Sequence, residues 1–197
     1  MTKWVEKEKR IDDIVAAAIE VFLEKGYESA SMESIANRAN MSKGGIYHHF
    51  GSKEEILFYV NNKLNDPISA MIQTALNASD VVLGIKQYIR DYLSYWINHK
   101  KEMAFYFLTM TKALESPKMW KIYEDYYNEM TNFFISLFER GIKEGHLKEH
   151  NLKSAAVTLM SAMDGVMTYL IMNHGLSIEE VAEDLENRYI NAILTGR

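Results

Sequence analysis

Apolar residues recur at steps of three and four along almost the whole chain, which is the period of an amphipathic α-helix. No stretch of four to eight residues between turn signals alternates as a β-strand does. The clearest apolar stripe runs from Ile11 to Leu23, and Gly26 is expected to end that helix. The pattern therefore predicts an all-α protein of about nine helices without a sheet.

Several helix starts are crowded into the first third of the chain. Ser31 and Ser42 can each N-cap a short helix, and only a tight turn separates the two. Ser52 and Glu55 form a capping-box pattern that opens a longer helix. Pro67 interrupts the continuing apolar period of that helix, so we expect a bent helix there.

The remainder of the chain keeps the helical period. Further helices are expected to begin near Asp80, Ser116, Asn151 and Ser177, each of which can accept hydrogen bonds from the first free backbone amides. The stretch from Met103 to Met110 is apolar all round, which predicts a fully buried helix.

The composition excludes several classes of function. The 197 residues contain no cysteine, which excludes disulfides and thiol nucleophiles and fits a cytoplasmic protein. Apolar runs such as Ala104 to Leu108 are far shorter than the roughly 20 residues that span a bilayer, so no membrane partner is expected. The common hydrolase, phosphate-binding and zinc-protease motifs are missing, and the histidines lack metal-ligand spacing. We therefore expect no enzyme activity, catalytic residue, metal or cofactor.

The segment from Ser31 to Lys53 is the most informative part of the chain. Two short helices joined by a tight turn are the arrangement that fits the major groove of B-DNA. Residues 34–53 contain Arg38, Lys43 and Lys53 and no acidic residue, whereas the whole protein has a net charge of −5. A local cationic block is what phosphate binding requires of an otherwise acidic protein.

The second short helix begins with Gly44 and Gly45, although glycine costs roughly 1 kcal/mol relative to alanine in a helix. We interpret both as positions where the backbone approaches DNA closely. Tyr47 and His48 offer donors to the sugar-phosphate backbone, and Lys53 offers a point charge. In the alternative interpretation, the glycines mark a turn and the histidine pair is solvated surface.

These residues belong to a longer pattern over roughly residues 10–57. It consists of Phe22, Gly26, Tyr27, the SMESIA segment from Ser31, Ala39, the SKGGIYHHF segment from Ser42, and SKEE from Ser52. The pattern resembles the N-terminal signature of the tetracycline-repressor (TetR) family of bacterial transcriptional regulators. The remaining 140 or so residues show no motif, and their similarity to that family is architectural only.

The resemblance implies a three-helix, helix-turn-helix DNA-binding domain over residues 1–52 and a larger helical ligand-binding and dimerisation domain over residues 53–197. It places the segment from Ser42 to His48 in the major groove. The residues expected to contact DNA are Ser31, Ser42, Lys43, Gly44, Gly45, Tyr47, His48 and Lys53. Because Ser34 rather than Glu follows Ser31 by three positions, we expect an incomplete capping box and a Ser31 hydroxyl that is free for DNA.

The resemblance also implies a homodimer formed through the last two long helices. Small residues such as Ala162 and Gly165 on the helix from residue 152 permit close packing. A dimer would read two half-sites of a palindromic double-stranded DNA operator. Alternatively, the same faces complete the core of a monomer.

The resemblance further implies a small-molecule effector between the middle helices, where aromatic and methionine side chains suit an apolar or flat ligand as well as an ordinary core. The expected lining is Tyr92, Trp96, Met103, Phe107, Met110, Trp120, Tyr123, Tyr127, Met163, Asp164 and Met167, with Asn98, His99, Thr109 and His174 as further polar candidates. Asp164 lies among apolar positions, so its carboxylate requires a partner, which is an interhelical hydrogen bond, a helix end or a cationic effector.

The sequence thus predicts a regulator that leaves its operator when an effector binds, with the helix bent at Pro67 as the lever between ligand site and DNA-binding domain. The alternative is a DNA-binding protein whose C-terminal domain docks a protein partner instead of a small ligand.

Overall fold

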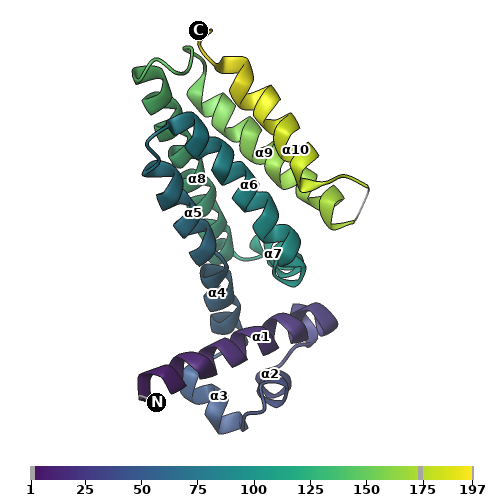
Figure 1. Cartoon of the computed structure of the whole chain (residues 1–197). Helices are drawn as coiled ribbons and strands as arrows, with labels where there is room; N and C mark the ends of the chain where they lie inside the picture. The colour runs from purple at the N-terminus through teal and green to yellow at the C-terminus, as the bar shows by residue number, and fades with distance from the viewer. Residues whose placement is uncertain (1–2, 173–174, 197) are drawn as a thin grey trace. The chain divides into compact units, whose positions relative to one another are not determined.

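A computed structural model describes residues 3–172 and 175–196, which are helical almost throughout (Figure 1). Within these residues the only β structure is an isolated bridge between Leu147 and Leu194. The helices are α1 (Lys3–Ser29), α2 (Met32–Arg38), α3 (Lys43–His49), α4 (Lys53–Leu64), α5 (Asp66–Leu76), α6 (Val81–Asn98), α7 (Lys100–Ala113), α8 (Pro117–Lys143), α9 (Leu152–Ile171) and α10 (Ile178–Leu185). The predicted all-α class is confirmed.

The helices belong to two compact units. The first comprises residues 1–66 and 101–119, and therefore contains α1 to α4 together with α7. The second comprises residues 67–100 and 120–197. The chain passes between the units three times, and α7 joins the first unit although it follows α6 directly. The functional division after residue 52 stays a prediction.

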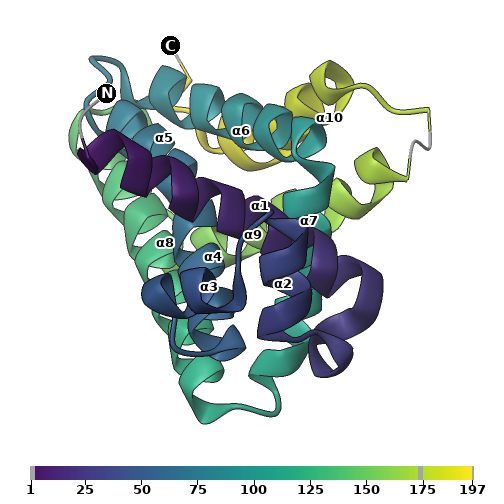
Figure 2. The same cartoon turned by 90° about the horizontal axis from the view of Figure 1, so that it is seen from below.

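In the first unit, α1 lies against α2 and α4, and α2 lies against α3 (Figure 2). Phe22 of α1, Ile35 of α2 and Ile46 of α3 are fully buried, as is Phe105 of α7. The rings of Phe22 and Phe105 are 6.0 Å apart. The apolar stripe of each short helix is thus the side that packs against α1 and its neighbours.

In the second unit, α6 lies next to α9 and α10, and α9 runs beside α10 (Figure 1). Tyr88, Phe134 and Leu159 are buried between these helices and α8. After α10, the chain continues as a π-helical turn over Glu186–Ile190 and a 3-10 turn over Asn191–Ile193. The last predicted helix, which begins near Ser177, is therefore α-helical only as far as Leu185.

Pro67 does not bend a continuous helix, so that prediction is also wrong. Helix α4 ends at Leu64, Asn65 caps it, and α5 begins at Asp66. Pro67 lies in the first turn of α5, where a helix needs no amide donor from it. The predicted break at Gly26 is confirmed, because Gly26 has φ 73° although helical residues continue to Ser29.

The prediction that residues 103–110 form a fully buried helix is wrong. Met103 and Phe105 are buried, but Phe107 and Met110 on α7 keep 38% and 41% of their surface exposed. Apolar residues on all sides of a helix do not reveal which side faces solvent.

Helix α9 is the one helix of the described chain whose length and apolar composition would allow it to cross a membrane. Only a third of that apolar stretch is buried within the fold. The core helix of a soluble protein meets the same criterion, so the finding is weak support for a membrane span. It does show that most of this apolar stretch is not buried by the described part of the fold.

Candidate functional site

The start of α3 is formed by Ser42, Lys43, Gly44 and Gly45. The Ser42 hydroxyl accepts a hydrogen bond of 3.1 Å from the amide of Gly45, which fixes the first turn. A Cβ atom added at Gly45 would lie 3.2 Å from this hydroxyl, so the cap itself favours glycine there. A Cβ atom at Gly44 would meet no atom within 4 Å. Nothing inside the described fold therefore requires glycine at position 44.

The outer side of α3 carries the other predicted DNA-contacting residues. Lys43, Gly44 and His48 are exposed, and Tyr47 keeps 47% of its surface exposed. Lys43 makes no hydrogen bond or ion pair with any described residue. Ile46, on the opposite side of the helix, is buried. The helix therefore presents a polar face with a free cation to solvent.

Arg38 does not contribute a free charge to this surface. Its guanidinium forms ion pairs with Glu20 at 2.9 Å and Glu24 at 2.6 Å. Hydrogen bonding to Arg38 lowers the pKa of both carboxyl groups, which stay ionised at neutral pH. Arg38 thus joins α2 to α1.

Lys53 is also held by the first unit itself. Its Nζ donates hydrogen bonds to the carbonyl oxygens of Tyr27 at 2.7 Å, Glu28 at 3.1 Å and Ala30 at 3.1 Å. The ammonium also lies 4.5 Å from the centre of the Tyr27 ring. These carbonyls end α1, where a cation is favourable. Lys53 therefore caps α1, and its predicted phosphate contact would have to compete with three carbonyls.

Helix α1 supplies positive charge that the sequence analysis missed. The pKa of His49 is lowered by burial and by the nearby charges of His48, Lys7 and Arg10. Lys7 and Arg10 are exposed. The sequence analysis looked for positive charge only within residues 34–53, although the cations at the start of α1 lie near the end of α3.

The expectation that the capping box of Ser31 is incomplete is wrong. Its Oγ accepts a hydrogen bond from the Ser34 amide at 3.1 Å, and the Ser34 Oγ accepts one from the Ser31 amide at 3.0 Å. Serine is long enough to complete this capping box, which the sequence pattern assigned to glutamate.

A small cavity lies within the second unit. Its volume is about 10 Å³, room for about one water molecule. It is lined by Tyr88, Tyr92, Tyr126, Tyr127, Met130, Phe134, Met160, Met163 and Asp164, which come from α6, α8 and α9.

Asp164 is the acidic group of this cavity. The Tyr92 hydroxyl donates a hydrogen bond of 2.8 Å to its Oδ1 across the two helices, which is the expected interhelical partner. Loss of hydration raises the pKa of Asp164, although the bond from Tyr92 acts in the opposite direction. No described Lys, Arg or His forms an ion pair with this carboxylate. Burial also raises the pKa of Tyr92 and Tyr126, so both hydroxyls stay protonated.

The structure brings four of the predicted effector residues together: Tyr92, Tyr127, Met163 and Asp164. The others lie elsewhere. Trp96, Tyr123 and Met167 are buried outside the cavity, Trp120 is exposed, and Met103, Phe107 and Met110 belong to the first unit.

Five lining residues are absent from the expected lining, among them Tyr126 and Phe134 of α8. With Met130 they form a series at four-residue steps along α8, a spacing that could have identified them.

The remaining polar candidates have local partners. The Asn98 amide donates to the carbonyl of Ser94, and the His99 ring bonds the carbonyl of Tyr95. Thr109 of the first unit donates to Asn61 at 3.0 Å. His174 lies outside the described residues.

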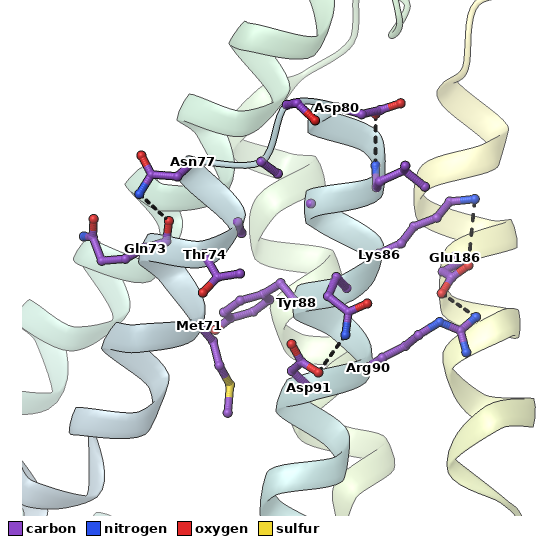
Figure 3. Close-up of a pocket in the computed structure, with 16 residues that line it drawn as sticks. Met71, Gln73, Thr74, Asn77, Asp80, Lys86, Tyr88, Arg90, Asp91 and Glu186 are labelled. Carbon is purple, nitrogen blue, oxygen red and sulfur yellow. Dashed lines mark hydrogen bonds and ion pairs between the residues drawn. The ribbon is translucent and has the colours of Figure 1, made fainter.

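A larger, open groove of about 940 Å³ lies between α5 and α6 and reaches Glu186 (Figure 3). Its charged groups are already paired. Arg90 and Lys86 approach Glu186 at 2.7 and 3.8 Å, and Gln87 donates to Asp91 at 2.8 Å. The charged groups of the groove therefore have partners within the second unit, whereas the carboxylate of the small cavity forms no ion pair with a described residue.

Two family models match the chain. Residues 14–60 match the bacterial regulatory proteins of the tetR family, and residues 84–195 match the C-terminal part of BetI-type transcriptional repressors. The chain belongs to the TetR family. The family that the sequence resemblance implied is thus confirmed, and TetR-family proteins are DNA-binding transcriptional regulators.

Individual relatives agree with this assignment. The chain is 25% identical over 170 residues to the TetC protein of transposon Tn10 from Escherichia coli, covering 86% of this chain and 82% of TetC. It is 36% identical over 73 residues to the transcriptional activator FasR of Mycolicibacterium smegmatis, or 37% of this chain and 33% of FasR. The crystal structure of the TetR-family regulator PfmR from Thermus thermophilus superposes with a TM-score of 0.75 at 23% identity, covering 90% of this chain and 97% of PfmR.

In this TetR-family fold, α2 and α3 are the helix-turn-helix pair, and both lie within the N-terminal match. The cavity around Asp164 lies within the BetI-type match. The two candidate sites therefore fall in different family regions of the chain.

Proposed function

We propose that this TetR-family protein is a homodimeric repressor that binds a palindromic operator in double-stranded DNA and leaves it when a small, largely apolar or aromatic effector binds. Operator binding implies that it acts in the cytoplasm. The observation that carries the DNA contact is Gly44, an exposed helical glycine with open space around it. Lys43, Tyr47 and His48 on the same short helix support this contact.

One face of α9 supports the homodimer. Val157, Ser161, Gly165, Tyr169 and Met172 follow one another at steps of three to four residues, and all are exposed. Tyr169 and Met172 keep 59% and 66% of their surface exposed, and a Cβ at Gly165 would meet no atom within 4 Å. A row of small and apolar residues allows the α9 helices of two subunits to pack closely across a two-fold axis.

The chain offers a route from the cavity to the DNA-binding unit. Tyr92 and Asp164 join α6 to α9, and α7 follows α6 after His99. Helix α7 is tied to α1 by the ion pairs Lys101–Glu20 at 3.1 Å and Lys112–Glu28 at 2.8 Å. An effector that shifts α6 would pull on α7 and hence on α1. The lever that the sequence predicts at Pro67 lies at the start of α5, where the chain passes from the first unit to the second, and it is a second connection between them.

Selection of bound duplexes from a random DNA pool tests the proposal. The expected result is a palindromic sequence that binds much more tightly than random competitor at moderate salt, as a dimer. Repeating the selection with a library of small apolar and aromatic compounds should identify compounds that weaken binding. A monomer without any sequence preference would contradict the proposal.

The direction of regulation needs a separate test, because the C-terminal match is named for repressors and FasR is named an activator. A reporter gene placed behind the selected operator should be expressed more strongly when the regulator is deleted. The exposed face of α9 also keeps a protein-docking role as a second candidate. An effector pocket predicts a thermal shift with small hydrophobic compounds, whereas a docking module does not.

A further inference from the structure

The start of α1 and the end of α3 carry a cluster of four basic side chains in the first unit: Lys7, Arg10, His48 and His49. His48 is exposed, and the ring centres of His48 and His49 are 5.4 Å apart. Lys7 and Arg10 are exposed and lie close enough to act electrostatically on His49. The two histidines are the only members of this cluster that change charge near neutral pH.

The cluster has no acidic partner. Within the described residues, no carboxylate forms an ion pair with Lys7, Arg10 or either histidine, although Glu8 and Asp13 lie on the same helix as the two cations. Several other charged groups of α1, α2 and α4 have partners of their own: Arg38 with Glu20 and Glu24, Asp12 with Lys63, and Glu55 with the amide of Gly51. The cluster therefore has no counter-ion within the described fold.

These surroundings oppose protonation of the histidines while no anion is bound. Burial and the charges of His48, Lys7 and Arg10 lower the pKa of His49. A phosphate oxygen acts in the opposite direction, because a nearby negative charge favours the protonated ring, whose two nitrogens both become donors. A histidine that is mainly neutral in the free protein and protonated beside a phosphate takes up a proton when DNA binds.

We propose that His48 and His49 couple operator binding to proton uptake, so that the affinity for DNA rises as the pH falls. This inference rests on the proposed function, because it requires the outer face of α3 to lie against DNA. The gain in affinity is fully present below the pKa of the histidines in the free protein. It is lost as the pH rises through their higher pKa in the complex.

The dissociation constant is measured by fluorescence anisotropy with the full-length protein at one ionic strength, because phosphate contacts depend strongly on salt. The probes are the selected operator and a random duplex of the same length. A change of one unit in the pKa of one histidine corresponds to a tenfold change in affinity, so between about pH 8 and about pH 6 we expect a roughly tenfold fall in the dissociation constant for the operator. The random duplex should change in the same direction, because phosphates carry no sequence information.

Variants assign the effect to the two rings. His48→Gln and His49→Gln should each reduce the pH dependence, and the double variant should bind with an affinity that does not vary with pH. His48→Lys carries a permanent charge, so it should keep the affinity of the low-pH state up to about pH 8. His146→Gln, at a partly exposed histidine of the second unit, is the matched control and should keep the pH dependence of the wild type.

Isothermal titration calorimetry counts the protons directly. Binding enthalpies measured near pH 6.5 in two buffers with different heats of ionisation, PIPES and imidazole, should show an uptake of about one proton per subunit. The double variant should take up none. The His48 variants are expected to fold because this side chain is exposed, and thermal unfolding checks the His49 variants.

An operator affinity that is independent of pH, a pH dependence that survives in the double variant, or the absence of proton uptake would each overturn the inference. A protein that binds the operator equally at every pH leaves the proposed regulator intact. A protein that prefers no DNA sequence, yet binds the random duplex more tightly at low pH, refutes the proposed regulator and retains the proton-linked phosphate contact.

Discussion

Replacing Gly44 with alanine should stabilise the protein and weaken its binding to DNA. Gly44 lies in the first turn of α3, and a Cβ atom there meets no atom within 4 Å. Alanine is favoured over glycine in a helix by up to about 1 kcal/mol. For a chain of this size, that corresponds to a rise of roughly 2–4 °C in the unfolding temperature.

The loss of DNA affinity has a different origin. If the backbone at Gly44 touches DNA, an added methyl group overpacks that contact and costs about 1–3 kcal/mol. The dissociation constant for the selected operator should then rise roughly 5- to 150-fold. Fluorescence anisotropy with a labelled operator measures this change, and the salt concentration must be fixed because phosphate contacts depend on it strongly.

Gly45→Ala is the matched control for stability. Its Cβ would lie 3.2 Å from the Ser42 hydroxyl that caps α3, so we expect no gain in the unfolding temperature. A Gly44→Ala protein that is more stable and binds the operator as tightly as the wild type would refute the placement of the α3 start against DNA.

Lys53→Ala should lower the free energy of unfolding by about 1–3 kcal/mol, because it removes the cap of α1. The salt dependence of operator binding should stay unchanged. A salt slope that is flatter by about one unit would instead show that Lys53 contacts a phosphate. Gly165→Leu should convert the dimer to monomer in analytical ultracentrifugation, and an unchanged dimer would exclude this face of α9 as the interface. Asp164→Asn should be more stable than the wild type at neutral pH in thermal unfolding. The pKa of Asp164 is raised in the folded state, so folding loses stability as pH rises from the ordinary value of 3.8 through the raised pKa. The difference between variant and wild type should therefore vanish below about pH 4, and a constant difference would point to packing instead.

The local features of the fold could be predicted because their causes lie within a few residues. Asp80, Asn151 and Ser177 cap α6, α9 and α10 as expected, and each bonds an amide two or three positions ahead. Gly26 breaks α1 because glycine adopts a positive φ without strain. Such signals need no knowledge of the tertiary structure.

The errors arose where distant residues decide the outcome. Lys53 is held by carbonyls 23 to 26 residues earlier, so a cation that appeared free in the sequence proved to be a helix cap. The cavity depends on Tyr92 and Asp164, which are 72 residues apart. Periodicity identified the aromatic side chains of the middle helices, but it did not show that α7 belongs to the first unit. For that reason Met103, Phe107 and Met110, which belong to the first unit, were grouped with side chains of the second unit.

The residue at position 164 affects both the stability of the ligand-free protein and its response to an effector. Met160, Met163 and Met167 of α9 are buried, and a methionine at position 164 would pack there without burying a charge. The buried carboxylate lowers the stability of the ligand-free fold, and a bound effector would stabilise it. A ligand at a hundred times its dissociation constant stabilises the state it binds by about 2.7 kcal/mol. If this stabilisation differs by half of that amount between the DNA-bound and released conformations, the affinity for the operator changes about tenfold. A tenfold change is within the range of allosteric coupling. An effector therefore acts as the switch only if its affinity for the two conformations differs, and α6, which carries Tyr92 and leads into α7, is the element where that difference should arise.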